Sequence, residues 1–286
     1  MESGYAGAVD LLQRVGVKVA GSLPTGLKRW IHRHRMFDTA TRRWYGAMVA
    51  GTAVIESGPL AGVRLCAGEH VSHAHIRGTY ELATQEAIAA SVRPGMVCYD
   101  LGASIGYLAL LMAHRGARRV YAFEPAPHAQ SILAAHIREN GMEDRIELVP
   151  VVVADRPQKV RFGLSRSAYG SRIVDADRQG EHIDVTATTL DDFVETHDPP
   201  DFIKIDVEGA ESAVLRGGRR VLERRPVICV EIHSHEQALA VSQILSEYGY
   251  TLSQITESGQ TPYSPGEARP GDVQVMAVPA GRIPLS

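Results

Sequence analysis

The chain of 286 residues lacks several features that mark membrane, secreted and nucleic-acid-binding proteins. Its three cysteines, at positions 66, 98 and 229, are odd in number and widely spaced, which supports neither a disulfide framework nor a cysteine zinc site. No apolar run approaches the length of a membrane span, and the N-terminus has no basic segment followed by an apolar one, as a signal peptide would. The net charge of −3 argues against a nucleic-acid partner. We therefore expect a cytoplasmic protein with no membrane span and no nucleic-acid partner.

From residue 96 onward, strand-like and helix-like segments alternate. Strands are expected at 96–101, 119–124, 146–153, 201–206, 226–232, 249–255 and 272–278. Helices are expected at 105–115, 127–140, 189–196, 209–217 and 235–248. This alternation predicts an α/β fold with a doubly wound, mostly parallel, Rossmann-like sheet of seven strands. Residues 155–187 are predicted to insert short strands, and residues 258–271, rich in Pro and Gly, to form a surface loop.

The residues before this alternation differ from it in pattern. Apolar residues at helical spacing predict helices within residues 1–50, and residues 52–66 read as a hairpin. A helix is expected at 80–92. We therefore divide the chain into an N-terminal extension, residues 1–75, and a sheet domain, residues 76–286. The extension is expected to act as a lid or as the contact of a homo-oligomer.

The first predicted strand ends at Asp100 and is followed by the turn Gly102-Ala103-Ser104-Ile105-Gly106. Glycine lets a backbone approach a ligand closely, and the following helix offers free N–H groups to a polar ligand. A dinucleotide site needs a third glycine in the middle of such a turn, and this chain has none. The turn thus disfavours a NAD-linked reductase and leaves room for a ligand carboxylate.

The second strand ends in Glu124-Pro125, about twenty residues after the glycine turn, which is the length of a strand–helix–strand unit. A carboxylate at this position can accept hydrogen bonds from both hydroxyls of a ribose. Alternatively, Glu124 supplies a carboxylate to the N-terminus of the helix at 127. The two roles are compatible.

A third acid follows the apolar strand Phe202-Ile203-Lys204-Ile205, in the segment Asp206-Val207-Glu208-Gly209-Ala210-Glu211. Ligands in open parallel sheets bind at the carboxyl ends of the strands, where the strand order reverses. Acids at these ends predict a pocket for a small, polar, partly cationic cofactor.

Together these residues resemble the class I S-adenosylmethionine (SAM) methyltransferases, and more narrowly the FkbM family. The resemblance is carried by Asp100–Tyr107, Phe123-Glu124-Pro125, Thr188-Thr189-Leu190-Asp191, Ile203–Glu211, Val214-Leu215-Arg216-Gly217 and Glu231-Ile232-His233. It covers residues 78–255, and I-D-V-E-G-A-E is its most specific part. The family more often has Asn where this chain has Ser104.

The resemblance implies a SAM-dependent methyl transfer to a small-molecule acceptor, most often a hydroxyl of a natural product or sugar. It assigns Gly102, Ala103, Ser104 and Gly106 to the methionine end of the cofactor, Glu124 to the ribose, Ala154 and Asp155 to the adenine, and Asp206 to the neighbourhood of the sulfonium. Further cofactor contacts are expected from Tyr80, Glu81, Asp100, Tyr107 and Pro125.

Four polar residues share faces of two neighbouring strands, because residues i and i+2 point the same way. With a simple register, Asp206 meets His233 near the pocket, while Lys204 pairs with Glu231 in a structural ion pair. His233 is the candidate general base, since an imidazole titrates near neutral pH, and Asp206 and Glu231 complete the candidate catalytic group. His235 is a second choice, because it is expected to open the next helix.

Other interpretations stay open at this level. Asp206, Glu231 and His233 include ligand types of a divalent metal, although their spacing is not a metal signature and no metal is favoured. The acceptor atom could be a nitrogen or a carboxyl oxygen. A catalytically silent binding module with the same fold is a further alternative, against which the three acids at positions 100, 124 and 206 argue.

Overall fold

The computed structural model describes residues 51–68, 70–164, 172–173, 180–267 and 273–281. The chain divides into two compact units, of which one comprises Met1–Ala53 with Ala67–His73 and the other Val54–Cys66 with Ala74–Ser286. Near their boundary lie strands β1 (Thr52–Val54) and β2 (Arg64–Cys66). Between these strands, the Ile55 N–H donates to the Val63 carbonyl at 2.8 Å, which confirms the predicted hairpin. The helices expected within residues 1–50 lie outside the described residues.

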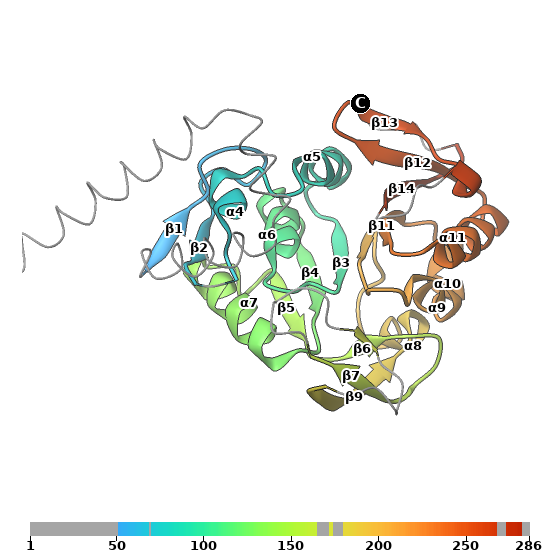
Figure 1. The fold of residues 1–286 in the computed structure, drawn as a ribbon, viewed down its shortest axis with the longest axis horizontal. Coiled ribbons are helices and arrows are strands. Elements are labelled where there is room, and N and C mark those ends of the chain that lie inside the picture. The colour runs from blue at the N-terminus through green and yellow to red at the C-terminus, as the bar shows by residue number, and fades with distance from the viewer. Residues whose placement is uncertain (1–50, 69, 165–171, 174–179, 268–272, 282–286) are drawn as a thin grey trace, which may run out of the picture. The chain divides into compact units, whose positions relative to one another are not determined.

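The second unit contains an eight-stranded sheet with the strand order β13-β12-β14-β11-β10-β3-β4-β5 (Figure 1). Its strands are β3 (Val97–Leu101), β4 (Arg119–Phe123), β5 (Ile146–Val149), β10 (Phe202–Ile205), β11 (Val227–Ile232), β12 (Tyr250–Thr256), β13 (Gly259–Pro262) and β14 (Val273–Pro279). Strands β11, β10, β3, β4 and β5 are parallel, whereas β14 is antiparallel to both β11 and β12. The doubly wound, mostly parallel α/β sheet is therefore confirmed.

The sheet has one strand more than the seven that we predicted. The extra strand, β13, pairs with β12 as an antiparallel hairpin inside residues 258–271, which the sequence indicated as a loop. All four β13 residues are exposed, so no hydrophobic alternation marked them as a strand. The hairpin turn is closed by Gly259, at φ +112°, whose carbonyl accepts a hydrogen bond from Thr256 Oγ1.

The predicted strand at 146–153 is broken in two at Pro150. Proline has no N–H to donate to a neighbouring strand, and here the Val151 N–H turns back to the Val149 carbonyl. The second half, β6 (Val152–Val153), joins a four-stranded sheet of order β6-β9-β7-β8. The other strands of this sheet are β7 (Gln158–Gly163), β8 (Arg172–Ile173) and β9 (His182–Thr188), as expected for the insertion at 155–187.

The described helices are α4 (His73–Arg77), α5 (Leu82–Ser91), α6 (Tyr107–His114), α7 (Pro127–Glu139), α8 (Leu190–Phe193), α9 (Glu211–Arg216), α10 (Arg219–Glu223) and α11 (His235–Glu247), with a short 3₁₀ helix at Pro265–Glu267. Helices α5, α6 and α7 cover one face of the central sheet, and α8 to α11 cover the other (Figure 1). Helix α10 was not predicted. Within the described ranges, the helices are too short or too polar to cross a membrane.

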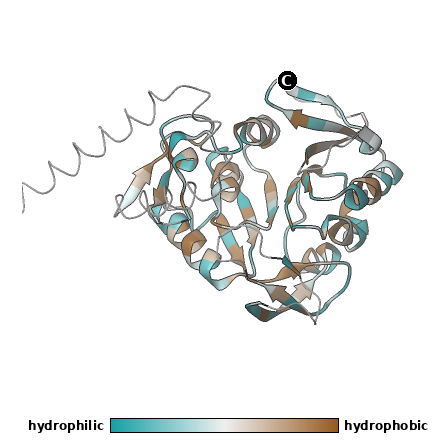
Figure 2. Ribbon diagram, viewed as in Figure 1, coloured by the Kyte–Doolittle hydropathy of each residue, from teal (hydrophilic) through white to brown (hydrophobic). Residues whose placement is uncertain are grey.

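Alternation along the strands decides which side chains reach which face. In β3, Tyr99 and Leu101 pack in the core under α8 to α11, so Asp100 points to the opposite face, toward α5 and α6. By the same alternation, Lys204 of β10 and Glu231 of β11 also point to the α5–α6 face. Hydrophobic residues line the central strands (Figure 2), and Cys98 and Cys229 are buried among them, as predicted.

Candidate active site

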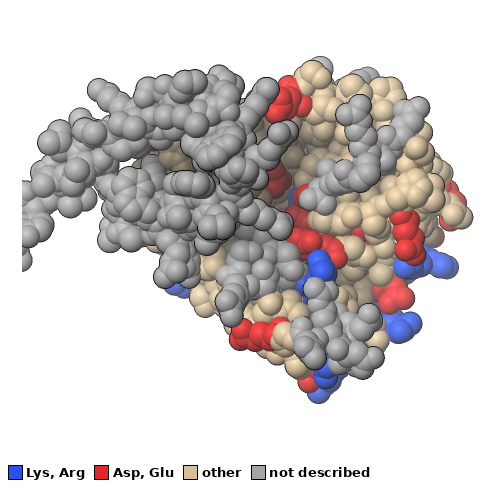
Figure 3. Space-filling model, in the orientation of Figure 1, with Lys and Arg blue, Asp and Glu red and all other residues tan. Residues whose placement is uncertain are grey.

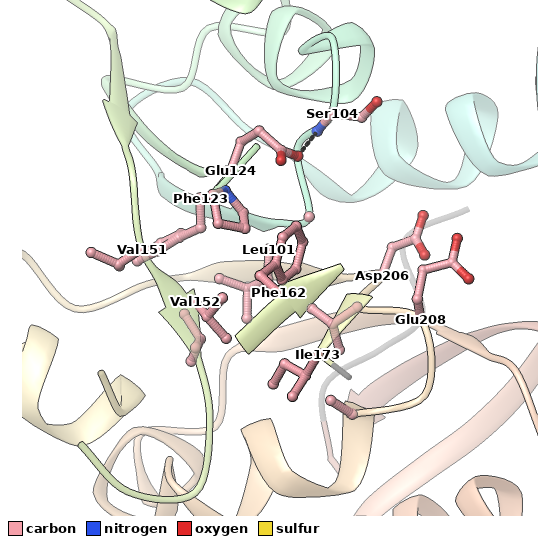
Figure 4. A pocket seen from close by; sticks show the side chains of 15 residues that line it. Leu101, Ser104, Phe123, Glu124, Val151, Val152, Phe162, Ile173, Asp206 and Glu208 are labelled. Atoms are coloured by element: carbon pink, nitrogen blue, oxygen red, sulfur yellow. Dashed lines mark hydrogen bonds between the residues drawn. The ribbon is translucent and has the colours of Figure 1, made fainter. Parts of the chain in front are cut away.

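A cavity opens at the carboxyl ends of β3 and β10, the two neighbouring strands between which the strand order reverses. The empty space within it measures about 660 Å³, which includes open solvent. The lining residues include Leu101, Gly102, Ser104, Phe123, Glu124, Pro125, Val151, Val152, Val153, Phe162, Ile173, Asp206 and Glu208. Figure 4 shows apolar side chains at one end and Asp206 and Glu208, pointing the same way, at the other.

The glycines of the first turn are required by neighbouring protein atoms. Gly102 has φ +81°, and a Cβ there would lie 1.8 Å from the backbone oxygen of Asp206. Gly106 has φ +84°, and its Cβ would lie 2.1 Å from Leu133 Cδ1. Of the residues that we assigned to the methionine end, Gly102 and Ser104 line the cavity, whereas Ala103 and Gly106 are absent from the lining.

Glu124 connects the first two strand ends. One carboxylate oxygen accepts a hydrogen bond from the Ser104 N–H and the other from the Ala126 N–H, both at 2.8 Å. Ala126 immediately precedes α7, so Glu124 does support the start of that helix, as the alternative interpretation held. Burial raises the pKa of Glu124 to about 7, against the opposing effect of the two amides. Each oxygen retains a second lone pair for a ligand hydroxyl.

Lys204 lies beneath the acidic end of the cavity and is 2% exposed. Its Nζ is 3.0 Å from Asp206 Oδ2 and 4.0 Å from Glu231 Oε2. We predicted the contact with Glu231, but the nearer partner is Asp206. The reason is the register, because Lys204 lies opposite Cys229 on one side and Asp100 on the other.

Carboxylates outnumber cations around this lysine. Burial raises the pKa of Asp100 to about 7, although Lys204 opposes it, and Asp100 Oδ2 is buried without a hydrogen-bond partner among the described residues. Burial and the nearby Asp206 also raise the pKa of Glu231, whose Oε2 accepts from Gln274. Burial by itself would lower the pKa of Lys204, but the surrounding carboxylates outweigh it and raise that pKa. A cationic ligand would relieve this excess of negative charge.

His233 follows β11 and lies among four carboxylates. Its Nδ1 is 2.8 Å from Glu211 Oε1. Its Nε2 is 3.5 Å from Asp206 Oδ1, the contact that we predicted, and 3.9 Å from Glu208 Oε2 and 4.0 Å from Glu231 Oε1. Within the described ranges, three residues could hold a metal ion together, because their ligand atoms all lie within 4.8 Å of one another: Asp206, Glu208 and His233. Our metal alternative had Glu231 where this set has Glu208.

Backbone strain gathers at this site. Among the described non-glycine residues, positive φ occurs at Glu81 (45°), Ser104 (50°), Glu208 (54°) and Arg225 (59°). Such conformations cost energy and cluster at functional sites. Ser104 and Glu208 line the cavity. Glu81 is close enough to affect the pKa values of Asp100 and Lys204, which it shifts upward.

Other predicted contacts lie away from the cavity. Tyr80 stacks on His75 and meets Tyr107 edge to face, with ring centroids 4.1 and 5.7 Å apart respectively. Ala154 and Asp155 are absent from the lining, where Val151, Val152 and Val153 occur instead. His235 is exposed at the first position of α11, as expected.

The structure also brings in residues to which the sequence gave no role. Glu208 lines the cavity, and Glu211 is fully buried against His233. Both belong to the segment Ile203–Glu211, which carried the family resemblance, and that resemblance was the signal in the sequence that could have pointed to them. Phe162 and Ile173 come from the inserted sheet, where nothing in the sequence pointed to a ligand.

Comparison with known proteins gives a consistent family. A model described as "Methyltransferase FkbM domain" matches residues 100–252. The chain is 30% identical over 164 residues to 2-O-methyltransferase NoeI of Sinorhizobium fredii, covering 50% of this chain and 66% of that protein. It is 28% identical over 165 residues to hexuronic acid methyltransferase AglP of Haloferax volcanii, covering 53% of this chain and 62% of that protein. The matched segments thus span just under two thirds of these relatives.

Among solved structures, the chain is similar to methyltransferase FkbM from Methylobacillus flagellatus. The two are 20% identical, with a TM-score of 0.46, over 72% of this chain and 55% of that chain.

Proposed function

Because the chain belongs to the FkbM methyltransferase family and is a methyltransferase, we propose that it transfers a methyl group from SAM to a hydroxyl oxygen of a small natural product or sugar. Two relatives are described as a 2-O-methyltransferase and a hexuronic acid methyltransferase; the first name supports an oxygen as the acceptor atom, and the second supports a sugar-like acceptor. The observation that carries the proposal is the joining of a cavity at the carboxyl ends of the parallel strands to a carboxylate-bound histidine, His233, through the Asp206 carboxylate.

The residues present fit SAM at both ends of the cavity. Gly102 and Ser104 would hold the methionine part, Glu124 the ribose, and the apolar end around Phe162 the adenine. The buried, unpartnered Asp100 Oδ2 and the surplus of carboxylates suit a cofactor with a positive ammonium and a positive sulfonium. When bound, SAM supplies a methyl group that is already activated by the sulfonium.

The protein must then position the acceptor and remove a proton. In this proposal, His233 Nε2 would take the proton of the acceptor hydroxyl while that oxygen gains the methyl group; the methyl–sulfur bond of the cofactor would break, and its sulfur would leave as a neutral thioether. The carboxylates of Asp206 and Glu231 stabilise the resulting imidazolium, which returns the proton to solvent after the product leaves. Lys204 lies behind Asp206 and balances part of the charge.

Acidic side chains gather near the middle of the face shown in Figure 3. A carboxylate at the reacting position would be repelled by Asp206 and Glu208, so hydroxyl groups are the first acceptors to test. For the N-terminal extension, residues 1–75, we keep the proposal of a lid or oligomer contact. A protein beginning at residue 51 should then still bind SAM, while its activity or oligomeric state changes.

The function can be tested in two steps. Calorimetric titration should give binding of SAM and none of NADH. Incubation with SAM and a panel of neutral glycosides, uronates, amines and carboxylic acids, followed by mass spectrometry, should then give a methyl ether. Absence of SAM binding, or methylation confined to amines or carboxylates, would contradict the proposal.

A further inference from the structure

The contact between Glu211 and His233 has a geometry that the proposed chemistry can use. Glu211 begins α9, and its side chain is 0% exposed. Its Oε1 accepts the Gly209 N–H at 2.8 Å and lies 2.8 Å from His233 Nδ1. A carboxylate only accepts hydrogen bonds, so the proton of the second bond belongs to Nδ1. The ring orientation and the tautomer are thereby fixed together.

The opposite ring nitrogen is directed toward the cavity side. His233 Nε2 faces Asp206 Oδ1 at 3.5 Å and Glu208 Oε2 at 3.9 Å, and both of these residues line the cavity. With Nδ1 protonated, a neutral His233 carries its lone pair on Nε2. The nitrogen nearest to the cavity is therefore the one able to accept a proton.

We propose that Glu211 is the positioning residue of His233, which holds the imidazole with Nδ1–H inward and presents the basic Nε2 to the acceptor hydroxyl. This inference rests on the proposed function, in which His233 is the general base. It gives a role to the last acid of the I-D-V-E-G-A-E segment, which the sequence left without one.

A purely structural role explains the burial of Glu211 poorly. Its second oxygen, Oε2, is buried and has no hydrogen-bond partner among the described residues. An unsatisfied buried oxygen destabilises the folded state. If Glu211 only had to accept the Gly209 N–H, an exposed side chain could do so without burying a carboxylate. The hydrogen bond to His233 is the interaction that needs a long, ionisable side chain; a shorter polar side chain would not make it.

Electrostatics act in the same direction. Burial by itself would lower the pKa of His233, but the hydrogen bond to Glu211 and the charges of Asp206, Glu211 and Glu231 outweigh it, raising the pKa above its ordinary 6.5. Glu208 also faces the ring, and Lys204 lies behind Asp206. A more basic imidazole accepts a hydroxyl proton more readily, while requiring a higher pH to be in its neutral form.

The test is made on the full-length protein without cofactor, with its histidine rings labelled with ¹⁵N. The His233 signals are identified by their loss in His233→Gln. In the wild type, NMR should show the Nδ1–H tautomer at high pH and a titration midpoint above 6.5. In Glu211→Gln, which keeps an acceptor but removes the charge, the midpoint should fall by about one pH unit or more. With SAM and the neutral glycoside that is methylated fastest in the panel above, kcat should fall roughly 10–100-fold, and the pH at which kcat rises should be lower.

Glu195→Gln is the matched control, since this exposed carboxylate pairs with Arg220 and should change neither the His233 signals nor kcat. An unchanged His233 midpoint in Glu211→Gln overturns the inference. So does a wild-type His233 in the Nε2–H tautomer, a measurement that needs no variant to fold. If Glu211 shifts the titration while His233→Ala keeps full kcat, the base assignment itself fails, and the inference with it. If His233→Ala is inactive and the titration is unmoved, only the inference about Glu211 fails.

Discussion

Lys204 Nζ lies 3.0 Å from Asp206 Oδ2 at the end of β10, and the Lys204 side chain is only 2% exposed. Removing one partner of a buried ion pair leaves an uncompensated charge. If Lys204 were removed, the uncompensated charges would be those of Asp206 and of Glu231, whose Oε2 lies 4.0 Å from Lys204 Nζ. The pair therefore connects the stability of the sheet to the electrostatics of the site.

We expect Lys204→Met to destabilise the fold by about 3–5 kcal/mol, the cost of an unpaired buried charge. Urea unfolding followed by circular dichroism measures this value. Lys159→Met, at an exposed position of β7, should change stability by less than about 0.5 kcal/mol. A similarly small effect at Lys204 would show that the pair is not required.

The two acids at the ends of β3 and β4 should control cofactor affinity. Asp100→Ala and Glu124→Ala are each expected to weaken SAM binding by about 1–3 kcal/mol, the scale of a lost charge-assisted hydrogen bond. Calorimetry measures the affinity. Because Glu124 also holds the Ser104 and Ala126 amides, Glu124→Gln and circular dichroism are needed to separate binding from folding. Unchanged affinity in both alanine variants would rule out this cofactor assignment.

Gly102→Ala tests the close approach of two backbones. Alanine at φ +81° is strained, and its Cβ would also meet the Asp206 oxygen at 1.8 Å. Gly62→Ala is a matched control, because Gly62 has φ +89° and no heavy atom within 4 Å of the added Cβ. The control should cost about 1–2 kcal/mol for its backbone alone. Gly102→Ala should cost roughly 1–3 kcal/mol more in denaturant unfolding. Equal losses at the two glycines would contradict this prediction.

The cofactor-free protein should become less stable as pH rises from 4 to 7. Burial raises the pKa of Asp100 from 3.8 to about 7, so in this window the folded state holds a proton that the unfolded state has released. The contribution is present below pH 3.8, is lost as pH rises through about 7, and is of the order of a few kcal/mol. Asp100→Asn should flatten this part of the pH profile of the melting temperature. A profile identical to that of the wild type would show that Asp100 does not titrate there.

The catalytic role of His233 can be separated from metal chemistry. As a general base, His233→Ala should lower kcat by roughly 10²–10⁴-fold with little change in SAM affinity. A chelator should leave wild-type activity in place. Loss of activity with a chelator and its recovery with a divalent ion would favour the metal alternative instead. If neither the substitution nor the chelator lowers kcat, catalysis depends on positioning alone or on a base supplied by Tyr80, Glu81 or His235.

The local features of the site were readable because each depends on neighbours in the chain. The glycine turn after Asp100, the acid at Glu124 and the segment from Asp206 to Glu211 each follow an apolar strand, and strand ends of a parallel sheet meet at one edge. A strand was missed where the chain shows no hydrophobic alternation, as in Gly259–Pro262, whose residues are all exposed.

The contacts of Asp206 with His233 and of Lys204 with Glu231 were predicted and are present, but the tertiary structure alone decided the register behind them. Parallel strands are joined by long crossovers, so nothing local fixes their register, and here Lys204 lies opposite Cys229, which brings Asp206 closer to Lys204 than Glu231 is. The side-chain alternation was predictable, but which face meets α5 and α6 was not. The bond between Glu211 and His233 joins the start of a helix to the end of a strand 22 residues later, and only the packing of α9 beside β11 brings them together.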